Sequence, residues 1–321
     1  MNVAQGFAPA EQREEGAALL ALGRWLAQQG YQFITPTPLT HQRNLDRHPG
    51  PAADLRDAFG WNRPFAAELL PAPLLEALQE AGVVVAETPG FWRSELRCSS
   101  LGNERLLHSG YPTDAADAVF FGPDTYRFAR AIGQHLLQRP AAPARAVDIG
   151  CGSGAGALVI AKACPHAEVW GTDINPHALA LTRVNAELAG AGNLRGQASD
   201  VLRDLPGAFD LIVANPPYMQ DPKGRAYRDG GSGLGSGLSL RILSEALPRL
   251  APGGTLLLYT GVAIVGGEDP FLTGARDVLE GFEGQWRYAE IDPDVFGEDL
   301  VLPGYASAER IAVVVLEATR A

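Results

Sequence analysis

Four consecutive residues, Asn215-Pro216-Pro217-Tyr218, have the types and order needed for chemistry on a nitrogen atom. The Asn215 side-chain oxygen and the Pro216 carbonyl can accept both N–H bonds of a planar NH₂ group. Such acceptors aim a delocalised nitrogen at an electrophile and stabilise the positive charge that develops on it. Pro217 stiffens the backbone, and the Tyr218 ring can stack on a flat group. Taken alone, the tetrapeptide is also compatible with a simple turn that ends a strand.

A second motif, Gly150-Cys151-Gly152-Ser153-Gly154, lies between the apolar run 146–149 and a small-residue helical pattern over 155–163. This order is typical of the first strand, the glycine turn and the following helix of a nucleotide-binding α/β sheet. Glycines permit a sharp turn close to a ligand, and the helix N-terminus supplies free N–H groups. Dinucleotides, flavins and S-adenosylmethionine all bind at such turns, so the motif alone does not choose among them.

Acidic residues mark the ends of the neighbouring apolar runs. Asp148 precedes the glycine turn, Asp173 follows the run 168–171, and Asp200 follows the run 194–199. Asp173 comes 23 residues after Gly150, close to the spacing at which an acidic residue binds ribose hydroxyls. Because ligands bind at the carboxyl ends of parallel strands, we expect these residues to line one site together with Asn215.

Strands alternate with helices from residue 145 onward, which predicts a doubly wound, mostly parallel, Rossmann-like α/β sheet. Helices are expected over 155–163, 176–189 and 271–281. The glycine-rich stretch 230–237 is expected to be either a mobile lid over the substrate or a flexible link. The seven expected strands are 145–149, 168–171, 194–199, 211–214, 255–259, 286–291 and 311–316.

Residues 1–110 are expected to form a separate, smaller α+β domain. Helices are predicted over 12–29 and 73–80, and strands over 83–86 and 91–101, an order that resembles a winged helix. This module either grips a substrate, RNA included, or is a structural cap. Residues 111–144 form a linker with an entry helix, and residues 145–321 form the second domain.

Composition narrows the class of protein. The 321 residues carry a net charge of −11, which argues against broad nonspecific binding to nucleic acid. The three cysteines and six histidines show no ligand spacing, so we expect no metal and a reducing cytoplasm. We predict no membrane association, because no apolar run reaches the roughly 18 residues that a transmembrane helix needs.

Residues from about Val119 to Leu316 resemble the class I S-adenosylmethionine-dependent methyltransferases, specifically the N-methyltransferases with Asn-Pro-Pro-Tyr. Within that class the chain looks most like the HemK/PrmC protein-glutamine N5-methyltransferases. Asp229-Gly230-Gly231, Gly237-Leu238 and Arg241 are similar to a glycine-rich segment of those enzymes. Two features depart from that pattern. Ten residues separate Tyr218 from Asp229 without the expected Glu-Pro, and the N-terminal module is not all-helical.

The resemblance implies S-adenosylmethionine as cofactor and assigns roles around it. Asp148 would orient the amino group of the cofactor, Asp173 would hold the ribose hydroxyls, and Ile174 would lie against the adenine. Apart from the resemblance, the place of Phe121 ahead of the Gly122-Pro123 turn predicts that its ring either covers one face of the cofactor or plugs the seam between domains. The remaining implied cofactor contacts are Gly150, Cys151, Gly152, Ser153, Gly154, Asp200, Val201 and Asn215.

The sequence therefore predicts an S-adenosylmethionine-dependent N-methyltransferase whose acceptor is a glutamine side-chain amide in a partner protein. One alternative is the exocyclic amine of an rRNA or tRNA base. A second alternative is an NAD-dependent oxidoreductase, because Gly150, Gly152 and Ala155 satisfy a looser dinucleotide fingerprint. Asp148 and the tetrapeptide argue against that second alternative.

Overall fold

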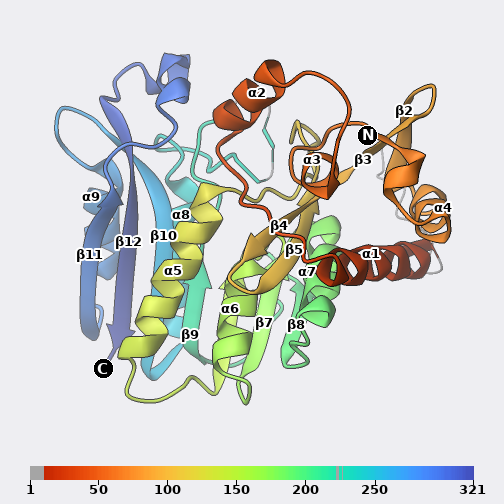
Figure 1. The fold of residues 1–321 in the computed structure, drawn as a ribbon. Helices are drawn as coiled ribbons and strands as arrows, with labels where there is room; N and C mark the ends of the chain where they lie inside the picture. The colour runs from red at the N-terminus through yellow and green to blue at the C-terminus, as the bar shows by residue number, and fades with distance from the viewer. Residues whose placement is uncertain (1–10, 222–223, 226) are drawn as a thin grey trace, which may run out of the picture. The chain divides into compact units, whose positions relative to one another are not determined.

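The computed structural model describes residues 11–221, 224–225 and 227–321 (Figure 1). The chain divides into two compact units. Unit 1 comprises the residues up to Asp114 together with 119–124 and 183–190, and unit 2 comprises residues 115–118, 125–182 and 191–321. Each unit therefore draws on more than one stretch of the chain.

Unit 1 is a small α+β structure, as predicted. Apolar residues at three- and four-residue spacing bury Leu19, Leu22 and Leu26 of helix α1. Three strands pair in the order β1-β3-β2, and β4 pairs with β5. The elements are α1 (Glu11–Gln28), α2 (Pro38–Arg47), α3 (Leu55–Phe59), β1 (Phe65–Ala66), η1 (Ala67–Leu69), α4 (Ala72–Glu80), β2 (Val84–Thr88), β3 (Phe91–Ser94), β4 (Leu96–Leu101) and β5 (Glu104–Ser109).

The expected single strand over 91–101 is wrong, because the chain changes sheets after Ser94. The Ser94 hydroxyl donates to the Leu96 carbonyl at 2.6 Å and accepts from the Leu96 N–H at 3.2 Å. This local bonding takes the backbone out of the ladder, so β3 pairs with β2 while β4 pairs with β5. Helix α2 and strand β5 were not predicted, although Thr37 caps α2 in front of Pro38.

Unit 2 contains the predicted seven-stranded, mostly parallel sheet, in the order β11-β12-β10-β9-β6-β7-β8. Strand β12 runs antiparallel to the other six strands of this sheet. The strands are β6 (Arg145–Ile149), β7 (Glu168–Asp173), β8 (Leu194–Ala198), β9 (Phe209–Ala214), β10 (Leu250–Ile264), β11 (Gly284–Asp292) and β12 (Arg310–Arg320). The helices are α5 (Pro123–Gln138, which begins in unit 1), α6 (Ala155–Ala163), α7 (Pro176–Leu188, which ends in unit 1), α8 (Gly237–Ala246) and α9 (Pro270–Leu279), with the short turns η2 (Leu247–Arg249), η3 (Gly297–Val301) and η4 (Pro303–Tyr305).

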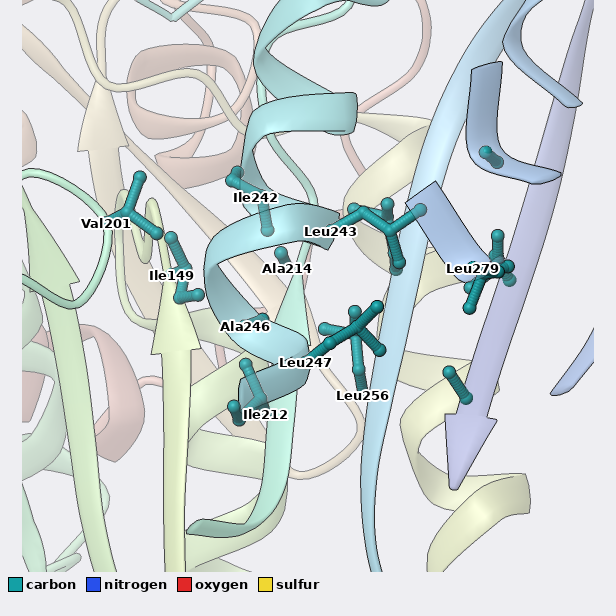
Figure 2. Close-up of a cluster of buried hydrophobic side chains, with 14 of the residues drawn as sticks. Ile149, Val201, Ile212, Ala214, Ile242, Leu243, Ala246, Leu247, Leu256 and Leu279 are labelled. Atoms are coloured by element: carbon teal, nitrogen blue, oxygen red, sulfur yellow. The ribbon is translucent and has the colours of Figure 1, made fainter. Parts of the chain in front are cut away.

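Helices cover both faces of this sheet. Successive side chains of a strand point to opposite faces, so one strand packs against helices on both sides. Leu256 and Leu258 of β10 join a core cluster with residues of α8 and α9. Tyr259 of β10 instead lies 5.9 Å from Phe128 of α5, measured between ring centres. Figure 2 shows Ile242 of α8 among the side chains of the first cluster.

Helix α8 was not predicted, since it begins inside the glycine-rich stretch.

Among the described residues, no helix is both long and apolar enough to cross a bilayer. All three cysteines, Cys98, Cys151 and Cys164, are buried and unpaired.

Candidate active site

The carboxyl ends of four parallel strands meet at one edge of the sheet. Ile149 at the end of β6 is the register partner of Ala214 at the end of β9, so Gly150 and Asn215 leave neighbouring strands side by side. Ile149 is also the partner of Thr172 in β7, which places Asp173 on the other side of the glycine turn. The structure therefore brings together the predicted residues of β6, β7 and β9.

The turn after β6 uses left-handed backbone at three glycines. Gly150, Gly152 and Gly154 have φ values of 68°, 54° and 82°, a region that favours glycine. The Cys151 N–H donates to the Thr172 carbonyl at 2.9 Å, which ties the turn to β7. Burial raises the pKa of the Cys151 thiol well above its usual range, so the thiol stays protonated.

Asp148 lies beneath this turn and is fully buried. Its Oδ2 accepts from the Ala157 N–H at 2.8 Å. Its Oδ1 is buried without a hydrogen-bond partner in the part of the chain that the structure describes. Burial, with a further contribution from Asp173, raises the pKa of Asp148 to about 7. A buried acceptor without a partner suits a ligand that brings its own donor or positive charge.

Asp173 and Ile174 follow β7 at the same edge. The Asp173 carboxylate accepts from the Gly152 N–H at 3.0 Å and from the Asn175 N–H at 2.9 Å, so it fixes the glycine turn as well. Burial raises the pKa of Asp173. Ile174 is 67% exposed, so its apolar surface is accessible to a ligand.

Asp200 and Val201 follow β8. The Asp200 carboxylate accepts from Arg241 of α8 at 2.7 Å, and this bond lowers the pKa of Asp200. Val201 is buried with a φ of 56°, a conformation that costs a branched residue on the order of 1–3 kcal/mol and that clusters at ligand sites. Sequence reasoning noted Arg241 in the glycine-rich segment but missed this ion pair, which joins positions 41 residues apart.

The tetrapeptide after β9 is partly accessible. Asn215 and Pro217 are half-buried, whereas Pro216 and Tyr218 are buried. No described residue forms a hydrogen bond with the Asn215 side chain. The Cδ2–Cε2 side of the Tyr218 ring lies against Gly261 of β10, where a Cβ atom would overlap the ring carbons.

The glycine-rich stretch 230–237 packs against the backbone at the end of the tetrapeptide. The Gly230 N–H donates to the Met219 carbonyl at 2.8 Å, and a side chain on Gly235 would overlap the carbonyl group of Tyr218. Glycines are required here because the segment packs directly on the backbone of Tyr218 and Met219. The stretch leads straight into α8, and its role as a lid or a flexible link stays a prediction.

Phe121, an expected cofactor contact, belongs to unit 1. Its ring is fully buried and stacks on His108 with 5.0 Å between ring centres. This contact gives the ring a packing role within unit 1. Among the residues placed in the structure, no group of three or more His, Cys, Asp or Glu side chains could hold a metal ion.

Two comparisons with known proteins identify the family. A family model described as the methyltransferase small domain matches residues 128–261. The 4-amino-L-phenylalanine/4-methylamino-L-phenylalanine methyltransferase of Streptomyces pristinaespiralis is 34% identical over 228 residues, which are 64% of this chain and 74% of that protein. The chain belongs to the class I S-adenosylmethionine-dependent methyltransferases. Family membership leaves the nicotinamide oxidoreductase alternative without support.

The predicted likeness to HemK-type methyltransferases is confirmed. The release factor glutamine methyltransferase of Bordetella pertussis is 38% identical over 176 residues, 50% of this chain and 63% of that protein. The Deinococcus radiodurans protein of the same name is 40% identical over 126 residues, 36% of this chain and 44% of that protein. The matched part of the chain thus spans about half the length of these relatives. A solved S-adenosylmethionine-dependent methyltransferase of Agrobacterium tumefaciens aligns with a TM-score of 0.48 and 19% identity, over 78% of this chain and 80% of that one.

Proposed function

We propose that this methyltransferase binds S-adenosylmethionine over the glycine turn and transfers its methyl group to a planar NH₂ group held by residues 215–218. The observation that carries this proposal is the pairing of Ile149 with Ala214. Neighbouring strands of a sheet lie about 4.8 Å apart, so the turn after β6 and the tetrapeptide after β9 begin within one strand spacing of each other.

The residues at the glycine turn fit this cofactor. The Asp148 Oδ1 atom, buried without a described partner, suits the amino group of the methionine part. Asp173 keeps carboxylate lone pairs for ribose hydroxyls besides its two backbone bonds, and exposed Ile174 offers an apolar surface for the adenine. Asp200 and Val201 would flank the adenine edge. When bound, the cofactor supplies an electrophilic methyl group on a sulfonium.

The tetrapeptide would position the nitrogen atom of the acceptor, which is the nucleophile. The Asn215 Oδ1 atom and the Pro216 carbonyl would accept the two N–H bonds of the acceptor and aim the nitrogen lone pair at the methyl group. The same two acceptors would stabilise the positive charge that grows on the nitrogen during transfer. Tyr218 would stack on the planar group, and its ring is held in place by Gly261.

The acceptor that we propose is the side-chain amide of a glutamine in a partner protein. Support comes from the relatives named as release factor glutamine methyltransferases. The comparisons do not favour the RNA alternative, and the net charge of −11 opposes attraction to phosphates. The three buried, unpaired cysteines suit the reducing cytoplasm in which we place the reaction.

A second candidate acceptor is an aromatic amine. The Streptomyces relative that is named for such a substrate shares 74% of its length with this chain, more than the two glutamine methyltransferases do. The ring of Phe296 also lies beside Tyr218, with 6.1 Å between ring centres. An aromatic acceptor would find a second ring there.

Isotope-labelled S-adenosylmethionine with purified protein separates these acceptors. One reaction contains a release factor and the other contains 4-amino-L-phenylalanine, with Asn215→Ala as the inactive control in both. We expect the label on a glutamine of the release factor, located by mass spectrometry of its peptides. Label only on the arylamine would replace the glutamine assignment by the second candidate. Absence of S-adenosylhomocysteine binding by calorimetry would overturn the function as a whole.

A further inference from the structure

Phe296 occupies an unusual position in the connector between β11 and β12. Its φ of 52° puts a bulky side chain in the left-handed region, which residues other than glycine rarely adopt. The residue is half-buried, and its ring meets the Tyr218 ring edge-on at 62° between planes. Backbone strain of this kind persists only where the surroundings hold it, and it concentrates at functional sites.

The connector is fixed on the N-terminal side of Phe296 and again just after it. The Val295 N–H donates to the Ile311 carbonyl at 2.8 Å, and the Val295 side chain is buried. The Asp299 N–H donates to the Phe296 carbonyl at 2.8 Å, which closes a turn that begins at Phe296. Asp299 also forms an ion pair with Arg228, whose guanidinium carbon lies 5.8 Å from the centre of the Phe296 ring.

A second attachment joins the connector to the residues that follow Tyr218. The Tyr305 hydroxyl is buried and accepts from the Gln220 N–H at 2.8 Å. The segment after Tyr218 and the connector are therefore bound together at Gln220 and at Arg228. Because Phe296 lies between the anchors of the connector, the ring is held at the edge of Tyr218 and does not move freely with a surface loop.

We propose that Phe296 is a specificity-determining residue that forms, with Tyr218, an aromatic corner for the acceptor. Gly261 lies against one side of the Tyr218 ring, and the plane of the Phe296 ring makes an angle of 62° with the plane of the Tyr218 ring. A flat group that stacks on one of two such rings presents its edge to the other, which is a favoured aromatic geometry. The corner accepts a planar aromatic amine as well as an amide. This inference rests on the proposed function of residues 215–218.

The test uses two nucleosides that differ by a phenyl group, so it does not depend on knowing the natural acceptor. In 5′-S-benzyl-5′-thioadenosine the sulfur carries a benzyl group where 5′-S-methyl-5′-thioadenosine carries a methyl group. We expect the benzyl compound to bind the full-length protein about 3–10-fold more tightly in calorimetry, the range of one aromatic pair. S-Adenosylhomocysteine is measured in parallel as the reference ligand.

Three variants connect that gain to the ring. Phe296→Leu removes the aromatic face, and Phe296→Gly removes it while relieving the left-handed backbone, which guards against misfolding of the first variant. Phe282→Leu is the matched control, because Phe282 is also half-buried but packs on the core cluster near α9. We expect both Phe296 variants to lose the benzyl gain, and we expect Phe282→Leu to keep it. The affinity for S-adenosylhomocysteine stays unchanged in all three.

The outcomes separate the two levels of the proposal. If S-adenosylhomocysteine does not bind the wild-type protein, the proposed function fails and the aromatic corner fails with it. If S-adenosylhomocysteine binds but the benzyl compound gains nothing, the corner alone is overturned. The same holds if the gain survives in both Phe296 variants. Loss of the gain in Phe296→Leu and Phe296→Gly alone confirms the assignment.

Discussion

The two halves of the site are built by different forces. The half around the glycine turn is held by backbone hydrogen bonds to groups next to it in the sheet, such as Gly152 N–H to Asp173 and Cys151 N–H to Thr172. The half around the tetrapeptide has hydrogen bonds too, such as Gly230 N–H to Met219, but it also depends on packing and an ion pair between segments far apart in the chain, with Gly261 against Tyr218 and Arg228 paired to Asp299. We call the half around the glycine turn the cofactor half and the half around the tetrapeptide the acceptor half. Cofactor affinity should therefore fall when a hydrogen bond of the cofactor half is removed, and turnover should fall when atoms are added to the acceptor half.

The largest effect is expected for Asn215→Ala, which removes an acceptor of the proposed transition state without touching the glycine turn. Removing one group that stabilises developing charge lowers turnover by about 10²–10³-fold. Turnover is measured as S-adenosylhomocysteine formation, and calorimetry checks that cofactor affinity is retained. Near-normal turnover would show that Asn215 does not hold the acceptor.

Gly261→Ala tests whether the acceptor half is sensitive to one added methyl group. The new Cβ overlaps the Tyr218 ring and displaces it, and a misplacement of about 1 Å can lower turnover by about 10²-fold. Cofactor affinity should stay constant because the glycine turn is unaffected. Gly192→Ala is the control, since a side chain there meets no heavy atom within 4 Å. Equal turnover in the two variants would contradict the packing of Tyr218 on Gly261.

Asp173→Ala should act on the cofactor half. It removes the acceptor for the Gly152 and Asn175 N–H groups, and each lost partner costs about 1–3 kcal/mol. We expect S-adenosylhomocysteine to bind about 10–100-fold more weakly in calorimetry, while the turnover number at saturating cofactor falls much less. A loss confined to turnover would place Asp173 in the acceptor half.

The pH dependence of cofactor binding sharpens the role of Asp148. Its pKa is raised to about 7, so the carboxylate is protonated below that pH and cannot pair with an ammonium group. Affinity for S-adenosylhomocysteine should therefore be greatest above pH 7 and fall by up to about tenfold for each pH unit below it. Asp148→Asn should bind more weakly and lose this dependence on pH. The measurement should span roughly pH 6 to pH 8, one unit on each side of this pKa. A wild-type affinity that stays constant over that range would contradict the pairing of Asp148 with the amino group.

The smallest effect is expected for a substitution within helix α5. Gly133 lies inside α5, and a side chain there meets nothing within 4 Å. Gly133→Ala should stabilise the protein by about 0.5–1 kcal/mol through helix propensity, seen as a higher midpoint of thermal unfolding. Turnover and cofactor affinity should not change. A change in either would show that the site couples to this face of α5.

Sequence reasoning reached the cofactor half because its geometry is local. The order of apolar run, glycine turn and acid predicts where Gly150 and Asp173 lie, and α6 begins and ends at the predicted residues. Strands β6 and β9 were predicted from their own residues, and their adjacency follows from the known order of such sheets. In this half, short stretches of sequence carry enough information.

The acceptor half could be predicted only in part. The tetrapeptide was identifiable, but nothing near Gly261 in the sequence signals that the Tyr218 ring lies on it. Phe296 comes 78 residues after Tyr218, and only the connector's fold brings the rings together. The glycines of 230–237 predict a lid or a flexible link by their type, and nothing in the sequence signals that two of them, Gly230 and Gly235, pack on the backbone of Tyr218.

A crystal structure of the protein with S-adenosylhomocysteine tests most directly whether the glycine turn and the tetrapeptide share one site. We expect the ligand to lie across Gly150–Gly154, with its amino group at Asp148 and its sulfur facing Asn215 and Tyr218. A ligand bound elsewhere, or a sulfur turned away from residues 215–218, would contradict the proposed methyl transfer.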